Sequence, residues 1–87
     1  MDMLEERIFN FGEKFKGRLD SLILDGALDY MNHNEVPLAF EILCDHICEY
    51  EISLSEIEYL EAMDLARDMN FDVTLGPYKH LKNLVVR

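Results

Sequence analysis

The sequence predicts an all-α protein, a compact bundle of four to five short helices that forms one domain over residues 1–87. A chain of 87 residues can build a single hydrophobic core, and 49% of these residues are hydrophobic. Apolar residues recur at intervals of three and four in four successive segments, which is the spacing of an amphipathic helix. The connections between the segments are short, so neighbouring helices should run roughly antiparallel.

The first helix is predicted by one apolar stripe near the N-terminus. The stripe comprises Leu4, Ile8, Phe11 and Phe15. Lys16 and Gly17 follow it, and a basic last turn followed by glycine is a common helix end. We therefore expect this helix to end near residue 17.

The second and third helices are expected to follow each other almost without a break. Asp20 or Ser21 can cap the second helix, which should close in the polar segment 32–34. Its expected apolar face comprises Ile23, Leu24, Ala27, Leu28, Tyr30 and Met31. Asn34 is the expected cap of the third helix, and Pro37 falls in its first turn, where the missing N–H costs nothing. The inward stripe of the third helix comprises Val36, Phe40, Leu43 and Ile47.

The fourth helix carries a capping signal at its start. Ser53 and Ser55 each precede a glutamate by three residues, at Glu56 and Glu58, and either pair can form a capping box. The helix should extend to about residue 70. Its expected inward residues are Ile57, Leu60, Met63 and Ala66.

The C-terminal segment begins with a helix-breaking Gly76-Pro77 pair. We expect the last ten residues to add a final helical turn to the bundle. The apolar run 84–86 also suits a strand, so this alternative stays open.

The charge is strongly negative and unevenly distributed. Eight Lys and Arg against 18 Asp and Glu give a net charge of −10. No Lys or Arg lies between Arg18 and Arg67, a stretch of 48 residues that holds 12 of the acidic residues. Nucleic acids and anionic membranes bind basic surfaces, so the charge argues against both as direct partners. The pattern predicts a basic protein partner, although solubility alone is a second explanation.

The predicted partner-binding surface is an acidic ridge on the third and fourth helices. Acids recur every four residues on the third helix, and four acids of the fourth fall within about a third of its circumference. If these two helices pair as a hairpin, the two rows merge into one ridge. The candidate partner-binding residues are Asp29, Glu41, Asp45, Glu49, Tyr50, Glu51, Glu58 and Glu61. Glu5 and Glu6, in the first helix, are expected to contribute much less.

Neither catalysis nor a metal or cofactor site is predicted. Cys44 and Cys48 share one helix face and His46 points away from them, so we interpret the thiols as reduced core residues. The serines lie at helix starts, where capping accounts for them, and the glycines form no phosphate-binding loop. Reduced cysteines, an acidic N-terminus and the lack of an apolar leader or spanning segment favour the cytoplasm.

Several stretches of the chain carry a resemblance to a known family. They are ALDYMNHNE at 27–35, LAFEILCD at 38–45, EYEISLS at 49–55, MNFD at 69–72 and YKHLKNLVV at 78–86. Through these stretches the chain resembles the Maf-type immunity family, which comprises bacterial antitoxins paired with secreted polymorphic or contact-dependent toxins. The first helix matches poorly, and Asn70 stands where the family usually has glycine.

The resemblance implies a small antitoxin that binds and neutralises one cognate toxin domain, often a ribonuclease, including the EndoU-like kind. A basic nuclease would suit an acidic surface. Two other classes stay open. A small acidic adaptor could dock on a basic host protein. The sequence Asp20-Ser21-Leu22 is also similar to the phosphopantetheine site of acyl carrier proteins, although the acidic helix that follows that serine in the family is replaced here by apolar residues.

Overall fold

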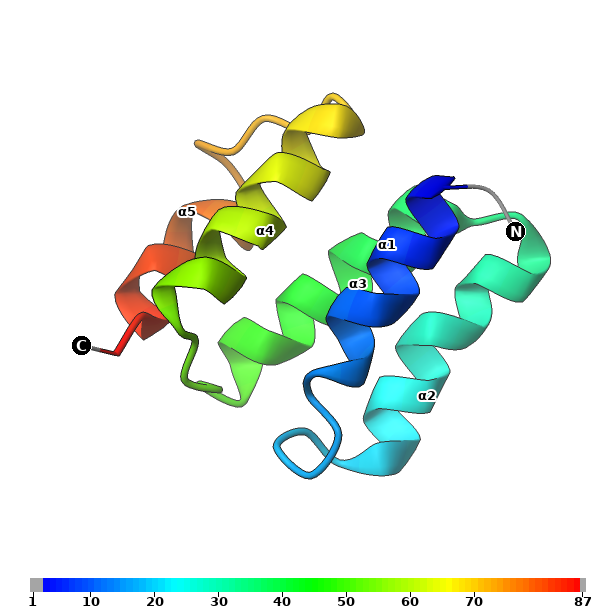
Figure 1. The fold of residues 1–87 in the computed structure, drawn as a ribbon, viewed down its shortest axis with the longest axis horizontal. Coiled ribbons are helices and arrows are strands. Elements are labelled where there is room, and N and C mark those ends of the chain that lie inside the picture. The colour runs from blue at the N-terminus through cyan, green and yellow to red at the C-terminus, as the bar shows by residue number, and fades with distance from the viewer. Residues whose placement is uncertain (1–2, 87) are drawn as a thin grey trace.

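The computed structural model describes residues 3–86, and all of the regular structure in this range is helical (Figure 1). The elements are α1 (Met3–Glu13), α2 (Ser21–Asp29), the 3-10 helix η1 (Tyr30–His33), α3 (Val36–Glu49), α4 (Glu56–Asp68), α5 (Tyr78–Leu81) and the 3-10 helix η2 (Lys82–Leu84). The predicted all-α bundle of short helices is confirmed. Across the described range, no helix has the length and apolar composition needed to cross a membrane.

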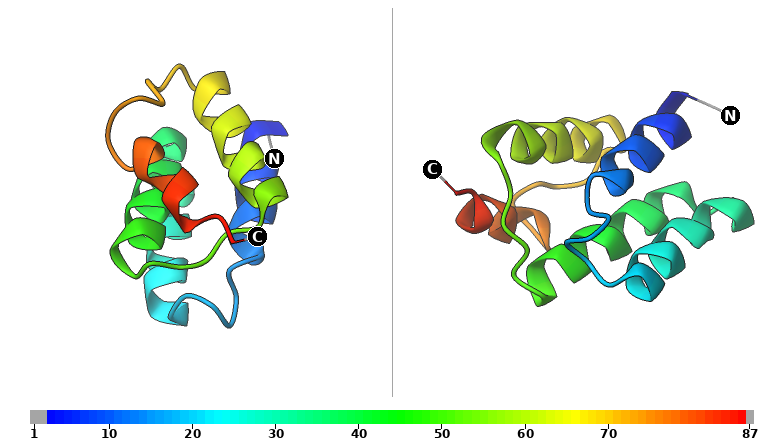
Figure 2. Two further views of the ribbon diagram at one scale, coloured as in Figure 1. Left: turned by 90° about the vertical axis from the view of Figure 1, so that its left-hand side faces the viewer. Right: turned by 60° about the horizontal axis from the view of Figure 1, so that its bottom comes forward.

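The bundle is arranged around α3. This helix packs against α2, α1 and α5, whereas α4 packs on α1 and α5. As a result, α1 and α4 form one layer above α2, α3 and α5 (Figure 2). The expected pairing of the third and fourth helices is therefore wrong, because the hairpin in this fold is formed by α2 and α3 and α4 crosses to the other layer.

Aromatic rings connect the helices through the core. Phe11 lies edge-on to Phe15 with ring centroids 5.1 Å apart, and 6.0 Å from Phe40 of α3. Phe40 stacks on Tyr78 of α5 at 6.1 Å, and Tyr78 stacks on Phe71 at 5.3 Å. The first three rings are fully buried. The predicted stripes of the first and third helices therefore do face the core.

The boundaries of the first two helices differ slightly from expectation. α1 ends at Glu13, and the chain leaves it through a turn in which Gly17 adopts a φ of 80°. Asp20, rather than Ser21, caps α2, because its carboxylate accepts a hydrogen bond from the N–H of Leu22 at 2.9 Å. Tyr30 was expected to face inward but is exposed, since the helix tightens to 3-10 geometry at this residue and the face it presents changes.

Three helical segments end on a residue in the left-handed region. Asn34, Glu51 and Asn70 have φ values of 59°, 49° and 61°. After each, a backbone N–H bonds back to the carbonyl five residues earlier, in the pairs Glu35–Tyr30, Ile52–Ile47 and Phe71–Ala66. This pattern is the Schellman motif, which satisfies the free carbonyls of a helix end. The prediction that Asn34 caps α3 is therefore wrong, because Asn34 ends the preceding helical segment.

The start of α4 was predicted correctly but half of its inward face was not. Ser55 and Glu58 form the expected capping box. Met63 and Ala66 are buried as expected, but Ile57 and Leu60 are 73% and 53% exposed, and the buried face continues through Ala62 and Leu65 instead. Glu58, Glu61 and Asp68 of α4 face α1 and the loop after it, and this rotation of the helix turns the two large apolar residues towards solvent.

The C-terminal segment is helical through α5 and η2, and in the described chain an isolated bridge rather than a strand follows them. α5 and η2 supply the helical turns, and the chain then extends beside the connection that precedes α4. Leu54 donates its N–H to Leu84 O and accepts from Val86 N–H, both at 2.9 Å. This isolated bridge joins the end of the described chain to a fully buried leucine.

Two helical glycines give a matched test of the packing between α1 and α2. A Cβ on Gly26 would meet nothing within 4 Å. Gly26→Ala should therefore raise the free energy of unfolding by about 0.5–1 kcal/mol through helix propensity and reduced chain entropy. A Cβ on Gly12 would lie 2.9 Å from Leu28 Cδ2. Gly12→Ala should therefore not raise the free energy of unfolding in the same way. Gly12→Val should lower it by about 1–3 kcal/mol through overpacking.

Urea unfolding of the three variants measures these differences. Equal stabilisation by both alanine substitutions would contradict the close approach of α1 and α2 at this point.

Candidate functional site

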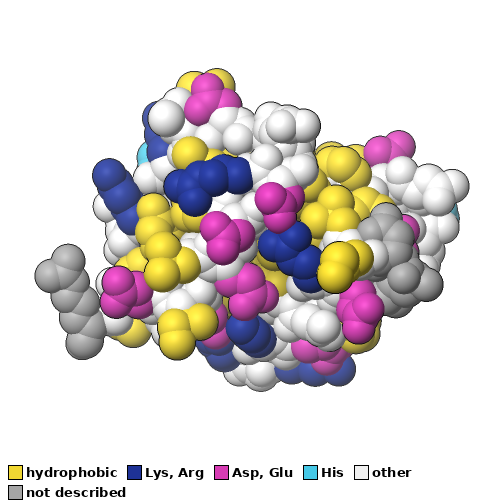
Figure 3. All heavy atoms as spheres, turned by 45° about the horizontal axis from the view of Figure 1, so that its top comes forward, with side chains coloured by type: hydrophobic (Ala, Val, Ile, Leu, Met, Phe, Trp, Pro, Cys, Tyr) yellow, Lys and Arg dark blue, Asp and Glu magenta, His cyan; other side chains and the backbone are white. Residues whose placement is uncertain are grey.

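Three ion pairs link α1 and the loop after it to α4. Their N–O distances are 2.6 Å for Arg7–Asp68, 2.8 Å for Lys14–Glu61 and 2.8 Å for Arg18–Glu58. The partners run in antiparallel order along the chain, and acidic and basic side chains lie interleaved on this face of the molecule (Figure 3). We call these six residues the α1–α4 seam.

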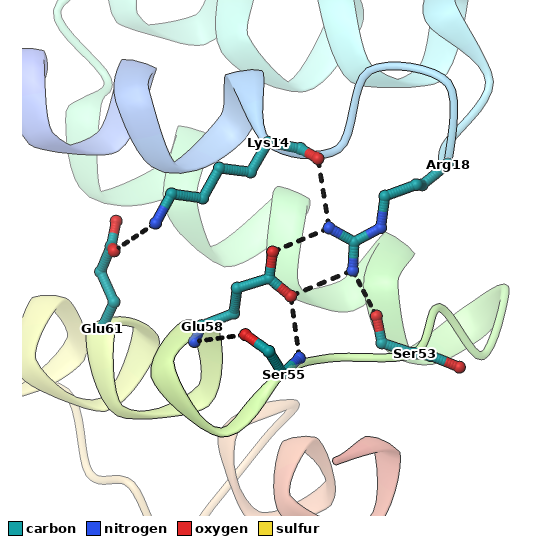
Figure 4. Close-up of polar contacts among 6 residues, drawn as sticks. All are labelled: Lys14, Arg18, Ser53, Ser55, Glu58 and Glu61. Carbon is teal, nitrogen blue, oxygen red and sulfur yellow. Dashed lines mark hydrogen bonds and ion pairs between the residues drawn. The ribbon is translucent and has the colours of Figure 1, made fainter. Parts of the chain in front are cut away.

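The pair between Arg18 and Glu58 is the most extensive of the three (Figure 4). Both guanidinium nitrogens donate to the carboxylate, at 2.8 and 3.0 Å, and one also donates to the Ser53 carbonyl. The guanidinium lies 4.7 Å from the centroid of the Phe15 ring. Arg18 therefore ties the loop after α1 to the connection before α4, through contacts that a lysine could not reproduce.

Glu58 is held in its charged form by this arrangement. The hydrogen bond from Arg18 lowers the pKa of Glu58, and the backbone and hydroxyl of Ser55 lower it further. The same hydrogen bond raises the pKa of Arg18. Because the carboxylate also completes the capping box, the seam and the start of α4 depend on one side chain.

The seam changes the interpretation of two predicted partner-binding residues. Glu58 and Glu61 were expected to extend the acidic ridge onto the fourth helix, but they bond to Arg18 and Lys14 of the same chain. Asp68 is likewise bonded to Arg7. The prediction of one continuous ridge over the third and fourth helices is wrong, because cations distant in sequence neutralise the α4 side of it.

The other predicted residues lie on α2, α3 and the turn that follows. We call residues 20–51 the acidic hairpin, since they contain eight carboxylates and no Lys or Arg. The eight acids are Asp20, Asp25, Asp29, Glu35, Glu41, Asp45, Glu49 and Glu51. Within the hairpin the basic groups closest to these acids are histidines, with His33 3.4 Å from Asp29 and His46 3.5 Å from Glu49. The hairpin thus retains the negative charge that α4 loses to the seam.

The carboxylates of α3 recur every turn on one side of the helix. Asp45 and Glu49 are exposed and Glu41 is half-buried. Partial burial raises the pKa of Asp45, and the charge of Glu49 adds to the increase while His46 opposes it. Burial also raises the pKa of the nearby Tyr78 hydroxyl, with contributions from the charges of Glu41 and Asp45. A cation from outside would therefore relieve electrostatic cost on this face.

The turn after α3 adds an aromatic side chain and a strained acid. Tyr50 is 49% exposed, and its ring centroid lies 6.2 Å from that of His46. Glu51 occupies the left-handed position of the Schellman motif, where glycine or asparagine is usual. A left-handed backbone is unfavourable for a residue with a long side chain, and such strain is often found at functional positions. Tyr50 is therefore accessible at this turn, and Glu51 adopts a backbone conformation that its side chain does not favour.

The cysteines belong to the core and its margin. Cys44 is fully buried, Cys48 is half-buried, and both are free thiols. Burial raises the pKa of each, which keeps both protonated at neutral pH. Among residues 3–86, no three His, Cys, Asp or Glu side chains are grouped in a way that could hold a metal ion.

Sequence reasoning missed most of the exposed apolar residues. Those in the described chain include Met3, Phe9, Leu22, Tyr30, Tyr50, Ile57, Leu60, Leu75 and Val86. For Phe9 a signal was available, because it lies beside Ile8 in sequence and so points away from the Ile8–Phe11 stripe by about 100°. No such signal marked Ile57 and Leu60, whose spacing fits the core face as well as the solvent face.

The seam should make stability depend on pH in a defined direction. Glu58 has a lowered pKa in the folded protein, so its stabilising effect is full above its unfolded pKa and is lost as pH falls through the folded value. Arg18→Met and Glu58→Gln should each lower the free energy of unfolding by about 1–2 kcal/mol at pH 7. The deficit of Glu58→Gln relative to wild type should shrink between about pH 5 and pH 3. Denaturant unfolding at several pH values tests this, and a deficit that is constant with pH would contradict the ion pair.

Glu51 gives a second stability test within the site. Replacement by glycine removes the left-handed strain, so Glu51→Gly should raise the free energy of unfolding by about 0.5–1 kcal/mol despite the added chain entropy. Glu49→Gly is the control, because Glu49 is the last residue of α3 and has no left-handed strain to relieve, so this substitution should not stabilise the protein. Thermal unfolding of both variants measures the difference. A destabilised Glu51→Gly would show that the side chain itself holds the turn together.

Comparisons with known proteins leave the function to be argued from the residues themselves. No protein-family model matches the chain, and no curated protein and no solved structure matches it. The geometry and charge of the acidic hairpin therefore carry the functional conclusion.

Proposed function

We propose that this chain is an immunity protein that binds a basic toxin domain, a nuclease, in the cytoplasm and neutralises it through the acidic hairpin. The observation that carries the proposal is the segregation of charge. The hairpin has eight carboxylates without a Lys or Arg, while Arg7, Lys14 and Arg18 are held in the seam. Uncompensated like charge lowers the stability of a compact fold, so a partner that supplies the cations accounts for its presence.

The remaining Lys and Arg side chains also lie outside the acidic hairpin. Lys16 is bonded to Glu13 and Arg67 lies 3.7 Å from Asp64. Of the Lys and Arg in residues 3–86, this leaves Lys79 and Lys82, on α5 and η2, without an ion pair. The field of the hairpin is therefore little reduced by the protein's own cations. Such a surface accelerates association with a basic partner towards about 10⁸–10⁹ M⁻¹s⁻¹ at low salt.

The resemblance to the Maf-type immunity family supports the same function. Asn70, which stands where that family usually has glycine, adopts a φ of 61°. This left-handed conformation is the one for which glycine is favoured and asparagine is the next best residue. Asparagine in place of glycine at this position is therefore compatible with the left-handed backbone conformation.

Two modes of inhibition follow from an acidic surface. The carboxylates can occupy the positions that substrate phosphates take in the nuclease cleft, or the hairpin can bind away from that cleft. Steady-state inhibition kinetics separate these modes, because only the first is competitive with RNA or DNA substrate. A small acidic adaptor for a basic host protein is the runner-up, and it would bind a partner without protecting cells from a toxin.

The proposal is tested by co-expression with the toxin domain encoded next to this chain. Wild-type protein should restore growth and bind the purified toxin domain stoichiometrically, and it should not protect against unrelated toxins. Asp45→Asn and Glu49→Gln should weaken binding by about 2–5 kcal/mol where the acid is buried against a cation, and otherwise mainly slow association at low salt. Growth arrest despite soluble, folded protein would overturn the proposed function.

Glu56→Gln is the matched control for these substitutions. Glu56 is an exposed acid at the start of α4, outside the acidic hairpin, and its neutralisation removes the same charge. If Glu56→Gln weakens binding as much as the α3 substitutions, net charge rather than the hairpin governs recognition.

A further inference from the structure

The helices α1 and α2 run next to each other (Figure 1). Side chains of both helices line a groove. Its volume is about 280 Å³, and Phe9, Leu28 and Met31 are among its lining residues. Gly12 allows α1 to approach Leu28, one of these lining residues, closely. The Phe9 ring is 40% exposed there, although an aromatic ring of this size is usually covered. The groove therefore presents an apolar floor without a partner.

Carboxylates line both sides of this floor. On α1, Glu5 and Glu13 lie one turn before and one turn after Phe9, and on α2, Asp25 and Asp29 are one turn apart. Lys16 is the one cation that lines the groove, and it is bonded to Glu13 at 2.6 Å and lies within electrostatic reach of Asp25. Four carboxylates against one ammonium group leave the groove strongly negative.

No structural role accounts for these acids as a set. Glu5 and Asp25 form no ion pair with another residue of the described chain. Asp29 is held in place by Asn32, whose side-chain amide donates to it at 3.0 Å, and this bond lowers the pKa of Asp29. The groove therefore has fixed negative charge on both sides, in contrast to the seam, where every acid has a cation of its own.

We propose that the groove between α1 and α2 docks a peptide segment of the toxin that presents one apolar side chain flanked by Lys or Arg. The inference rests on the proposed function and assigns a contact site to it. Charge complementarity selects the flanking residues, because their heads reach the carboxylates of the two sides. Their aliphatic stems, together with the apolar side chain, cover the floor. An arginine placed over Phe9 gains a cation–π contact as well.

Glu5 and Glu6 differ in their position relative to the groove. Both were expected to contribute little to binding, but Glu5 lines the groove beside Phe9, whereas Glu6 is exposed on α1 and does not line it. The two glutamates are adjacent, carry the same charge and belong to the same helix turn. Glu5→Gln and Glu6→Gln therefore form a matched pair. A difference in binding affinity between the two variants measures the contribution of the groove.

The first experiment uses a probe that does not depend on the identity of the toxin. The full-length, isotope-labelled protein is titrated with a synthetic peptide that carries a central leucine flanked by arginines, and with the same peptide carrying glutamates instead. The arginine peptide should shift the NMR signals of Phe9, Leu28 and Met31, and the glutamate peptide should shift none. Shifts confined to the α3 acids, or no shifts at all, would overturn the inference.

Substitutions then show which residues of the groove contribute to binding of the peptide. Phe9→Ala and Glu5→Gln should each weaken binding of the arginine peptide by about tenfold, because each removes a central contact or its charge partner. Met3→Ala and Glu6→Gln, which change exposed residues of the same helix outside the groove, should leave it within about twofold. Equal effects in both sets would overturn the inference. Self-association that Phe9→Ala abolishes would assign the groove to a second copy of this chain and would overturn it too.

The toxin assay separates failure of the inference from failure of the function. If wild-type protein neutralises the toxin and Phe9→Ala or Glu5→Gln does so equally well, the groove is not a toxin contact and the proposed function stands. If wild-type protein does not neutralise the toxin, the proposed function fails and the groove is not a toxin-docking site. Reduced toxin affinity of the groove variants, with Glu6→Gln unchanged, is the expected result.

Discussion

The α1–α4 seam is the interaction on which the arrangement of the bundle depends. α4 carries five acids and one arginine, and α3 carries three acids and no Lys or Arg. Direct pairing of these consecutive helices would place like charges side by side. The cations of α1 and the loop after it instead bind α4 within the layer that α1 and α4 form, and the bidentate contact of Arg18 with Glu58 anchors the start of α4. Partly buried, bidentate pairs of this kind contribute more than exposed ones, because the charges are less screened.

The position of α4 has consequences for both faces of the molecule. Three of its five acids, Glu58, Glu61 and Asp68, are bonded to cations of α1 and the loop after it, and its rotation exposes Ile57 and Leu60. α3 keeps its carboxylates, and Asp45, Glu49 and Glu51 gather at its C-terminal end, where the helix dipole already places about half a unit of negative charge. The fold therefore concentrates unfavourable charge on the acidic hairpin and neutralises three of the α4 acids in the seam, and this difference is the basis of the proposed cationic partner.

The sequence predicted what is local and missed what is tertiary. The stripes through Phe11 and Phe40, the Ser55 capping box and the acids of α3 follow from spacing within one helix, and each is present. Neither the partners of Glu58 and Glu61 nor the neighbour of α4 could be read from spacing, because Arg18 and Lys14 lie 40 and 47 residues away. The inward face of α4 was misassigned because Ala62, a small residue, packs in the core in place of the larger Ile57 and Leu60. A prediction from apolar periodicity favours large side chains as core residues, whereas closely packed helices often have small residues at their contacts.

The electrostatic environment of each acid offers a physical criterion for its role. Glu58 has a lowered pKa because the fold supplies a cation, so its charge stabilises the native state and it is a structural acid. Asp45 has a raised pKa because it is partly desolvated and lies near the charge of Glu49, so its charge works against folding. Asp29 is an intermediate case, in which a hydrogen bond from the neutral side chain of Asn32 lowers the pKa of Asp29 and His33, 3.4 Å away, lowers it further. Some carboxylates do not stabilise the fold but remain charged and accessible to solvent. These carboxylates are the best candidates for contact with a cation of another molecule. This distinction, rather than the total charge of −10, is the basis on which we propose the acidic hairpin as the binding surface and assign the seam to the stability of the bundle.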